Sequence, residues 1–233
     1  MSIAMQALRF SQDHVEGETV GDGAYRRIRA DIVSGKLRPL ERLKLEQLRE
    51  AYSVSVTTLR EILTRLAAED LVTAEGQRGF RVAPVSLADL KGLAELRTLL
   101  EVHALRLSLA NGDLDWQGQV VSAHYKLSVV EQDLLSNDLR TVAQWVEHDW
   151  GFHHATIAAC ATEPLMRMHA AVFDRYMRYH MLVLDFRGKP AADDHERLRD
   201  LVLERKTEAA VDLLTRHIGA GLERMLQSGK IPE

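Results

Sequence analysis

The stretch SVTTLREILTRLAAEDLVTAEGQRGFRV, from Ser55 to Val82, decides the fold of the first part of the chain. Ser55 can cap a helix, and the apolar residues that follow recur every three or four positions on one face, at Leu59, Ile62, Leu63 and Leu66. Two short runs typical of strands come next, residues 71–74 and 80–82, and a turn with two glycines separates them. The stretch therefore predicts a helix followed by a β-hairpin.

Two shorter helices are predicted before this stretch. The first begins near Ala24, because apolar residues recur at helical spacing until Gly35 ends the pattern. The second covers residues 45–51. Three helices and a hairpin make a winged helix-turn-helix, so we expect such a DNA-binding domain at residues 21–84, after a flexible tail at residues 1–20.

The rest of the chain has a different pattern. After Pro84, Ser86 can cap a further helix, and from there to about residue 228 apolar residues repeat at helical spacing without a convincing strand. We therefore predict a mostly α protein, in which the winged helix-turn-helix is followed by an all-α bundle of six or seven helices at residues 85–230.

Composition and charge narrow the class of protein. The 233 residues are 46% hydrophobic with a formal net charge of -4. Residues 22–83 carry 12 Lys and Arg against 9 Asp and Glu, whereas residues 84–233 carry 17 against 22, an asymmetry whose sign fits a DNA-binding first domain. The single cysteine, Cys160, rules out an intramolecular disulfide and is typical of a reducing compartment. Because the sequence has neither a signal peptide nor an apolar run of the roughly 20 residues that span a membrane, we expect a cytoplasmic protein without a membrane partner.

The polar face of the helix after Ser55 is the predicted DNA-reading surface. Arg60 is the best candidate for a base contact, since a guanidinium can donate two hydrogen bonds to guanine. Arg78 beside Gly79, at the tip of the hairpin, can approach a phosphate or the minor groove. The alternative is that an exposed arginine on a helix is only a solvated charge.

Asp149 and His153 form an inward pair in the second half. They are four residues apart, so they lie on one helix face, and apolar Val146 and Ile157 share that face. A buried carboxylate and imidazole must pair or bind something. His195 and His217 also stand where a leucine would be unremarkable, and the four residues make a credible divalent metal site for Zn, Ni or Mn.

Other readings of the polar residues stay open. A lone histidine on an apolar face is more often a satisfied core residue than a ligand. No role is assigned to several other histidines, including His14, His103, His124, His169 and His180. Arg97 shares a face with leucines and needs an anion, which is either a bound effector or Glu101, four residues on. Arg175 and Arg178 are weaker effector-binding candidates.

Residues 24–83 resemble the N-terminal domain of GntR-type transcriptional regulators, through SGKLRPLERL (34–43), LEQL (45–48), VSVTTLREILTRLAAEDLV (54–72) and RGFRV (78–82). The resemblance implies DNA contacts from Arg42, Ser55, Thr57, Thr58, Arg60, Arg65, Arg78 and Gly79. The family usually has Arg and Pro where this chain has Val56 and Thr58, and Gly where it has Leu40 and Asp70. Because one usual DNA contact is lost at Val56, the operator sequence or affinity is expected to differ from the family norm.

The second half resembles the FCD effector domain of the FadR-type branch of these regulators. The similarity lies in R-x-x-x-E at Arg97 and Glu101, D-x-x-x-H at Asp149 and His153, and the later histidines at 195 and 217. It implies that the four inward residues bind a metal and that a small organic acid binds beside it. One departure is Thr162-Glu163-Pro164, where the family commonly has an asparagine.

Three functions follow from these observations. The first is a ligand-responsive regulator, most simply a repressor: a homodimer on a palindromic double-stranded DNA operator, released or recruited by a small carboxylate. The second is a metalloenzyme, which also needs a general acid or base, and neither Glu147 nor Glu163 has an obvious inward position. The third is a regulator whose metal is purely structural. The sequence favours the first and predicts no enzymatic activity.

Overall fold

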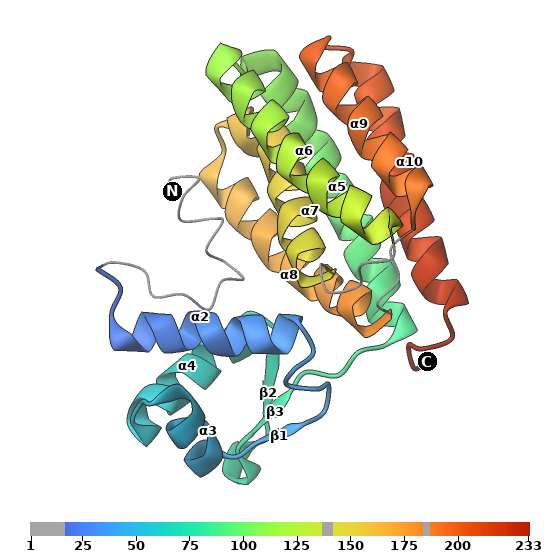
Figure 1. Cartoon of the computed structure of the whole chain (residues 1–233). Helices are drawn as coiled ribbons and strands as arrows, with labels where there is room; N and C mark the ends of the chain where they lie inside the picture. Colours follow the sequence, from blue (N-terminus) through green and yellow to red (C-terminus); the bar gives the residue numbers. More distant parts are fainter. Residues whose placement is uncertain (1–16, 137–141, 184–186) are drawn as a thin grey trace. The chain divides into compact units, whose positions relative to one another are not determined.

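The computed structural model describes residues 17–136, 142–183 and 187–233, and the chain divides into two compact units after Val85 (Figure 1). The expected tail, residues 1–20, lies mostly outside the described residues. Its last residues belong to the first unit, because Thr19 caps the first helix of the described residues, α2 (Val20–Val33), by accepting a hydrogen bond from the backbone N–H of Asp22.

The helix-turn-helix consists of α3 (Leu45–Tyr52) and α4 (Val56–Ala68). Ser55 caps α4 as its sequence predicts, because its hydroxyl accepts the Thr58 N–H at 3.1 Å. The apolar stripe of α4 is buried and packs against α2 and the sheet. The core that these elements form includes Ile28, Leu59, Leu63, Leu66 and Val82.

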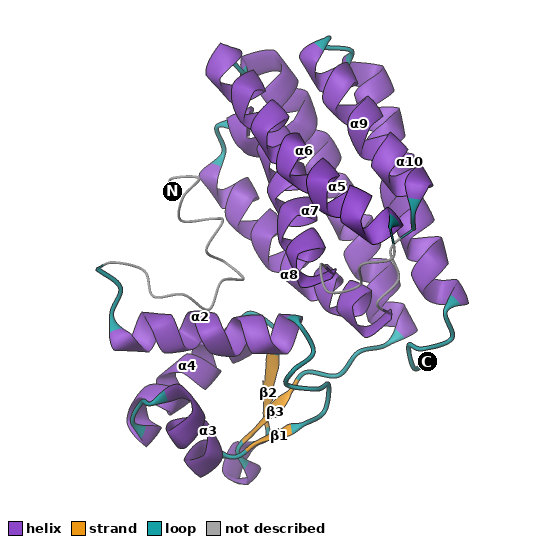
Figure 2. Cartoon of the chain, viewed as in Figure 1, coloured by secondary structure: helices purple, strands orange, loops and turns teal. Residues whose placement is uncertain are grey.

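The wing contains three strands, one more than the sequence predicted (Figure 2). β2 (Val72–Ala74) and β3 (Phe80–Val82) pair antiparallel, with Val72 opposite Val82, and the two-residue strand β1 (Arg42–Leu43) pairs with the other edge of β3. A 3-10 turn, η1 (Gly76–Arg78), fills the hairpin loop. β1 was missed because two residues are too few to show an alternating pattern. The first unit is thus a winged helix-turn-helix, as predicted.

The second unit is a helical bundle, which confirms the predicted class. Within the described residues after Val85 it contains six α-helices and one 3-10 turn and no strand: α5 (Leu87–Asn111), α6 (Leu114–Leu135), α7 (Val142–Ile157), η3 (Ala158–Cys160), α8 (Glu163–Val183), α9 (Lys189–Leu203) and α10 (Thr207–Gln227). None of the described helices is long and apolar enough to cross a membrane.

Packing within the bundle brings distant segments together. α5 packs against α8 and α10, and α6 packs against α7 and α9. Aromatic side chains such as Phe152, Phe173 and Tyr176 fill the core and are fully buried. The same core contains many buried charged and histidine side chains, an expensive arrangement unless each is paired or binds something. These side chains define the candidate site of the second unit.

Candidate functional site

The N-terminal part of α4 presents the polar surface expected to read DNA. Thr57 and Arg60 are exposed, and the guanidinium of Arg60 has no hydrogen-bond or ion-pair partner among the described residues. Ser55 and Thr58 are instead engaged in the cap, with their hydroxyls 2.9 Å apart. Of these four residues, Thr57 and Arg60 are therefore the ones whose side chains are available to a ligand.

Arg42, Arg78 and Gly79 come together at the wing. Arg42 donates from Nη2 to the backbone carbonyl of Arg78 at 3.1 Å, which ties β1 to the hairpin loop. Gly79 has a φ of 90°, a conformation that strains any residue with a Cβ. The exposed side chain of Arg78 thus stands on a loop whose shape depends on Gly79.

Arg65 has a different environment from the other predicted contacts. Its guanidinium lies 3.7 Å from the centre of the Tyr25 ring and 3.7 Å from carboxylate oxygens of both Asp22 and Glu69. These contacts connect α4 to α2. The side chain of Arg65 therefore contributes to the packing of α4 on α2, and it would have to give up these contacts to reach DNA.

The four predicted metal ligands converge in the bundle, and each is buried. The ligand nitrogens of His153, His195 and His217 lie within 4.8 Å of one another. Asp149 Oδ1 lies 3.4 Å from His195 Nε2 and 3.9 Å from His153 Nε2. Metal–ligand bonds of about 2.0–2.2 Å bring ligand atoms to separations of about 3–3.5 Å, so small adjustments suffice for these four to surround one divalent ion.

Each histidine is backed by a carboxylate on its other ring nitrogen. His153 Nδ1 lies 3.1 Å from Glu101, and His195 Nδ1 lies 2.7 Å from Glu131. His217 Nδ1 lies 3.1 Å from Asp194. A carboxylate on Nδ1 orients the ring and directs Nε2 toward a metal. His153 Nε2 is buried without a hydrogen-bond partner, which an ion would satisfy.

The electrostatics favour the neutral imidazole at His153 and His217, as ligation requires. Burial lowers the pKa of His153, although Glu101 opposes this. Burial and the neighbouring His195 and His153 lower the pKa of His217 well below its ordinary value. Burial would raise the pKa of Glu101, but the charge of Arg97 and the two histidines on it hold that pKa well below the ordinary value, so the carboxylate stays ionised.

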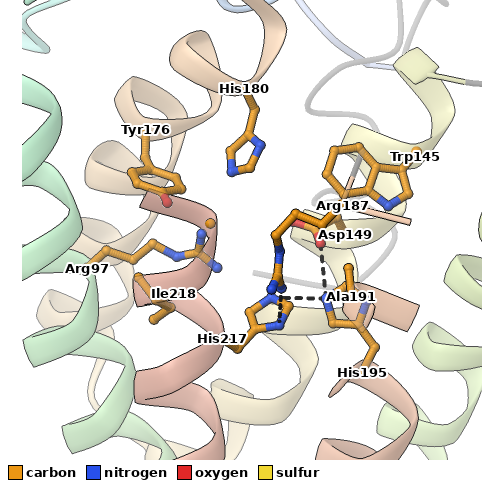
Figure 3. Close-up of a pocket in the computed structure, with 11 residues that line it drawn as sticks. Arg97, Trp145, Asp149, Tyr176, His180, Arg187, Ala191, His195, His217 and Ile218 are labelled. Carbon is orange, nitrogen blue, oxygen red and sulfur yellow. Dashed lines mark hydrogen bonds and ion pairs between the residues drawn. The ribbon is translucent and has the colours of Figure 1, made fainter. Parts of the chain in front are cut away.

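Arg97 lies beside this cluster, and its predicted ion pair with Glu101 is present, while a contact with an effector stays a prediction. Its Nε donates to Glu101 at 2.6 Å, while its buried Nη2 has no hydrogen-bond partner and lines a cavity (Figure 3). The rings of Phe173 and Tyr176 lie 4.3 and 4.8 Å from its guanidinium carbon. The buried Tyr176 hydroxyl is also without a partner and also lines the cavity.

The cavity itself is small and polar. It is lined by Arg97, Asp149, His195, His217, Tyr176, Trp145, His180, Arg187, Ala191, Ile218 and Gly221. Its volume is about 20 Å³, which suits an ion and about one water. A carboxylic acid of several carbons therefore requires a side chain of the lining to move.

The weaker effector candidates lie elsewhere. Arg175 forms an ion pair with Asp89 at 2.7 Å, and Arg178 is buried in α8. Neither residue belongs to the described lining of the cavity. The structure gives no reason to assign either one to an effector.

Sequence reasoning missed several residues of the site. His180 lines the cavity, and His169 Nε2 donates to the Glu101 carboxylate at 3.0 Å, although neither histidine was assigned a role. Glu131 was detectable, because it follows Leu127 by four residues on the buried face of α6. Asp194 and Arg187 had no such signal, since they approach His217 from outside any apolar stripe.

Comparisons with known proteins agree with both units. Residues 21–82 match the family model of bacterial regulatory proteins of the gntR family, and residues 92–220 match the FCD domain. The chain is 37% identical over 211 residues to an uncharacterized HTH-type transcriptional regulator, BphR of Paraburkholderia xenovorans, covering 89% of this chain and 86% of that protein. It is 32% identical over 200 residues to the HTH-type transcriptional repressor GlaR of Escherichia coli, covering 83% and 90%.

Solved structures share the fold. A putative transcriptional regulator GntR from Rhodococcus sp. RHA1 aligns with a TM-score of 0.73 and 23% identity, over 89% of this chain and 97% of that one. McbR/YncC of E. coli aligns with a TM-score of 0.77 and 17% identity, over 90% and 98%.

Proposed function

The chain belongs to the gntR family of bacterial regulatory proteins and carries an FCD domain, and from this premise we propose that it senses a small carboxylate at a metal centre and adjusts DNA binding accordingly. DNA binding and transcriptional regulation come with the family. The metal, the acid, the dimer and the sign of regulation are the parts that we add.

The observation that carries the proposal is that two kinds of polar group lie together at one cavity, which Asp149, His195 and His217 line and His153 adjoins. Three histidines and Asp149 offer neutral nitrogens and a carboxylate to a divalent ion of the Zn, Ni or Mn type. Beside them, Arg97 Nη2 and the Tyr176 hydroxyl are buried donors without partners. A carboxylate that bound the ion with one oxygen and Arg97 with the other would satisfy both.

The proposed regulatory step is a shift between two arrangements of a homodimer on a palindromic double-stranded operator. An acid can cause such a shift only to the extent that it binds one arrangement more tightly. We propose repression in the resting state, for which the support is the relative GlaR, named as a repressor. We expect the DNA contacts from Thr57 and Arg60 on α4 and from Arg78 on the wing.

A mobility-shift assay tests the proposal. The metal-loaded protein is mixed with DNA that flanks its own gene and with a panel of sugar acids, hydroxy acids and amino acids. We expect one acid class to change the DNA affinity, and we expect His153→Ala to abolish that response. The matched control is His103→Ala, an exposed histidine on α5, which should respond like the wild type.

Three results would contradict the proposal. If the mobility shift were the same with and without every acid that binds, the protein would not be a sensor of these acids. A lower melting temperature on metal removal, with no acid binding to the loaded protein, would make the metal structural. Conversion of a bound acid to product above the background rate would identify a metalloenzyme.

A further inference from the structure

Gly221 leaves a space on the cavity side of α10, where any other residue would place a side chain. It is buried in the interior of this helix, four residues after His217 and therefore on the same helix face. Glycine is a poor residue for the interior of a helix, because it loses more conformational freedom on folding than any other residue. A Cβ at this position would lie 3.3 Å from the hydroxyl oxygen of Tyr176 and 4.0 Å from Nε2 of His180. The absent side chain thus leaves room next to two polar groups of α8.

These two polar groups reach the cavity from the same helix. Tyr176 and His180 are four residues apart, their ring centres lie 5.2 Å apart, and both line the cavity (Figure 3). The Tyr176 side chain is fully buried, and its hydroxyl has no hydrogen-bond partner among the described residues. A buried hydroxyl without a partner costs free energy, so the space beside it favours an atom that forms hydrogen bonds.

The same space lies close to the proposed carboxylate site. The ring of Tyr176 lies 4.8 Å from the guanidinium carbon of Arg97, whose buried Nη2 also has no hydrogen-bond partner among the described residues. A small acid whose carboxylate meets Arg97 would therefore place a neighbouring part of the molecule beside Gly221. The chemistry of that part is set by the groups around it.

The charges of the cavity favour a neutral polar group there. An ammonium is disfavoured, because the guanidinium groups of Arg97 and Arg187 line the same cavity. A second carboxylate would need a cation of its own, and Arg187 is already paired with Asp194 at 3.4 Å. A methyl group would leave the Tyr176 hydroxyl without a partner. A hydroxyl group meets none of these objections, since it is neutral and can both donate and accept.

We infer that Gly221, the Tyr176 hydroxyl and His180 form a subsite for a hydroxyl group, and that the effector is a small hydroxy acid. Its carboxylate binds Arg97, and its hydroxyl occupies the space that the absent Cβ of Gly221 leaves. The inference rests on the proposed function, because it assumes that a carboxylate binds in this cavity. It adds the chemical class of the acid and the residue that selects it.

Two pairs of acids, each differing by one hydroxyl, test the subsite. Calorimetry compares glycolate with acetate, and 3-hydroxypropionate with propionate, on Zn²⁺-loaded protein from which free Zn²⁺ has been removed. One hydrogen bond between neutral groups typically contributes a net factor of about 2 to 10 in affinity. Wild type should therefore prefer the hydroxy acid of at least one pair by about that factor.

Three variants show whether the preference arises at the subsite. Gly221→Ala fills the space with a methyl group and should remove the preference, while acetate and propionate still bind. Gly219→Ala is the matched control on the same helix, because a Cβ at that position would project into open space, and it should keep the preference. Tyr176→Phe retains the ring and removes only the hydroxyl, so it should abolish the preference, and it tests the subsite even if Gly221→Ala does not fold.

The outcomes separate this inference from the proposed function. If no acid of either pair binds the loaded wild type, the carboxylate site is wrong, and the subsite with it. If the acids bind without a preference, the carboxylate site stands and the hydroxyl subsite is refuted. A preference that persists in Tyr176→Phe would mean that the hydroxyl binds elsewhere, such as at the metal. Equal losses for both acids of a pair in Gly221→Ala would also refute the subsite, since glycine would then only make room for the carboxylate.

Discussion

Two arginines on α4 show how local contacts decide which side chain is free to bind. Arg60 is exposed and its guanidinium has no partner among the described residues, whereas Arg65 is stacked on Tyr25 and close to two carboxylates. Arg65 would have to give up these contacts to reach DNA. Contact with a base is therefore expected from Arg60 more than from Arg65.

Replacing Arg60 by alanine should weaken DNA binding. Loss of a bidentate contact to guanine costs about 1–3 kcal/mol, or about 5- to 150-fold in affinity, and relaxes the preference at one base pair. Fluorescence anisotropy with the operator, and with operators altered at each guanine, measures both effects. Arg65→Ala is the control and should lower stability more than affinity. If Arg60→Ala lowered the affinity for all operator sequences equally, Arg60 would contact a phosphate and not a base.

The backbone of Leu40 adopts a strained conformation at a position where the family commonly has glycine. Its φ is 65°, in the left-handed region that costs a residue with a Cβ about 1–2 kcal/mol. The family commonly has glycine here, and Leu40 is 57% exposed, so its side chain has little packing to lose. Asp70, the second position where the family has glycine, has a φ of 57°.

Leu40→Gly should therefore stabilise the first unit. Relief of strain exceeds the entropic cost of glycine, about 0.5–1 kcal/mol, and leaves a net gain of about 0.5–1 kcal/mol. Hydrogen exchange of the buried amides of α4 measures the free energy of unfolding of this unit. Leu99→Gly, at an exposed position of α5, should instead destabilise the second unit. Faster exchange in Leu40→Gly would show that the leucine contributes packing.

At the scale of elements, the proposed metal site is assembled from side chains of several helices. α7 contributes Asp149 and His153, while α9 and α10 contribute His195 and His217. The supporting carboxylates come from α5, α6 and α9. Because each histidine is oriented by a residue of a different helix, the ligand geometry depends on how the helices pack.

Glu131→Gln tests this dependence on α6. The amide keeps the shape of the side chain but weakens the acceptor for His195 Nδ1, and loss of such a partner typically lowers metal affinity about 10- to 100-fold. Chelator competition with Zn²⁺ measures the change. Asp133→Asn, an exposed carboxylate two residues away on the same helix, is the matched control. Equal affinities for the two variants would show that Glu131 does not orient the ligand.

Helical spacing was enough to place the four candidate ligands inside the bundle, because it fixes which face a residue occupies. It could not show which residues meet across helices, since that depends on the packing and register of distant segments. His169 and Asp194 were missed for this reason. The fold could be read from local patterns, while the partners of each ligand required the structure.

At the scale of the whole molecule, the two units carry different spectroscopic reporters. All three tryptophans, Trp116, Trp145 and Trp150, lie in the second unit and are buried there. Tryptophan fluorescence therefore reports unfolding of the bundle alone. The same unit contains His124, His180 and His217, whose pKa values are lowered because burial penalises the charged imidazolium.

Acid should destabilise the bundle in a defined range of pH. Burial, together with the charge of Arg199, lowers the pKa of His124 to about 4, and burial lowers that of His180 to about 4. In the unfolded chain both histidines have a pKa of about 6.5. Between pH 6.5 and 4 the unfolded state therefore binds protons that the folded state does not, so the free energy of unfolding falls as the pH falls.

Urea titrations followed by tryptophan fluorescence, with a chelator present to exclude metal, measure this slope. Each neutral buried histidine contributes up to about 1.4 kcal/mol per pH unit, and the contribution of His124 should level off below pH 4, where the folded state also takes up the proton. His124→Gln should lower the slope of the free energy of unfolding against pH by the contribution of one proton. His103→Gln, which replaces an exposed histidine, should leave that slope unchanged. If the two variants had the same slope, burial of His124 would not be the source of the acid sensitivity, and the neutral state inferred for the histidines around the metal ligands would lose its support.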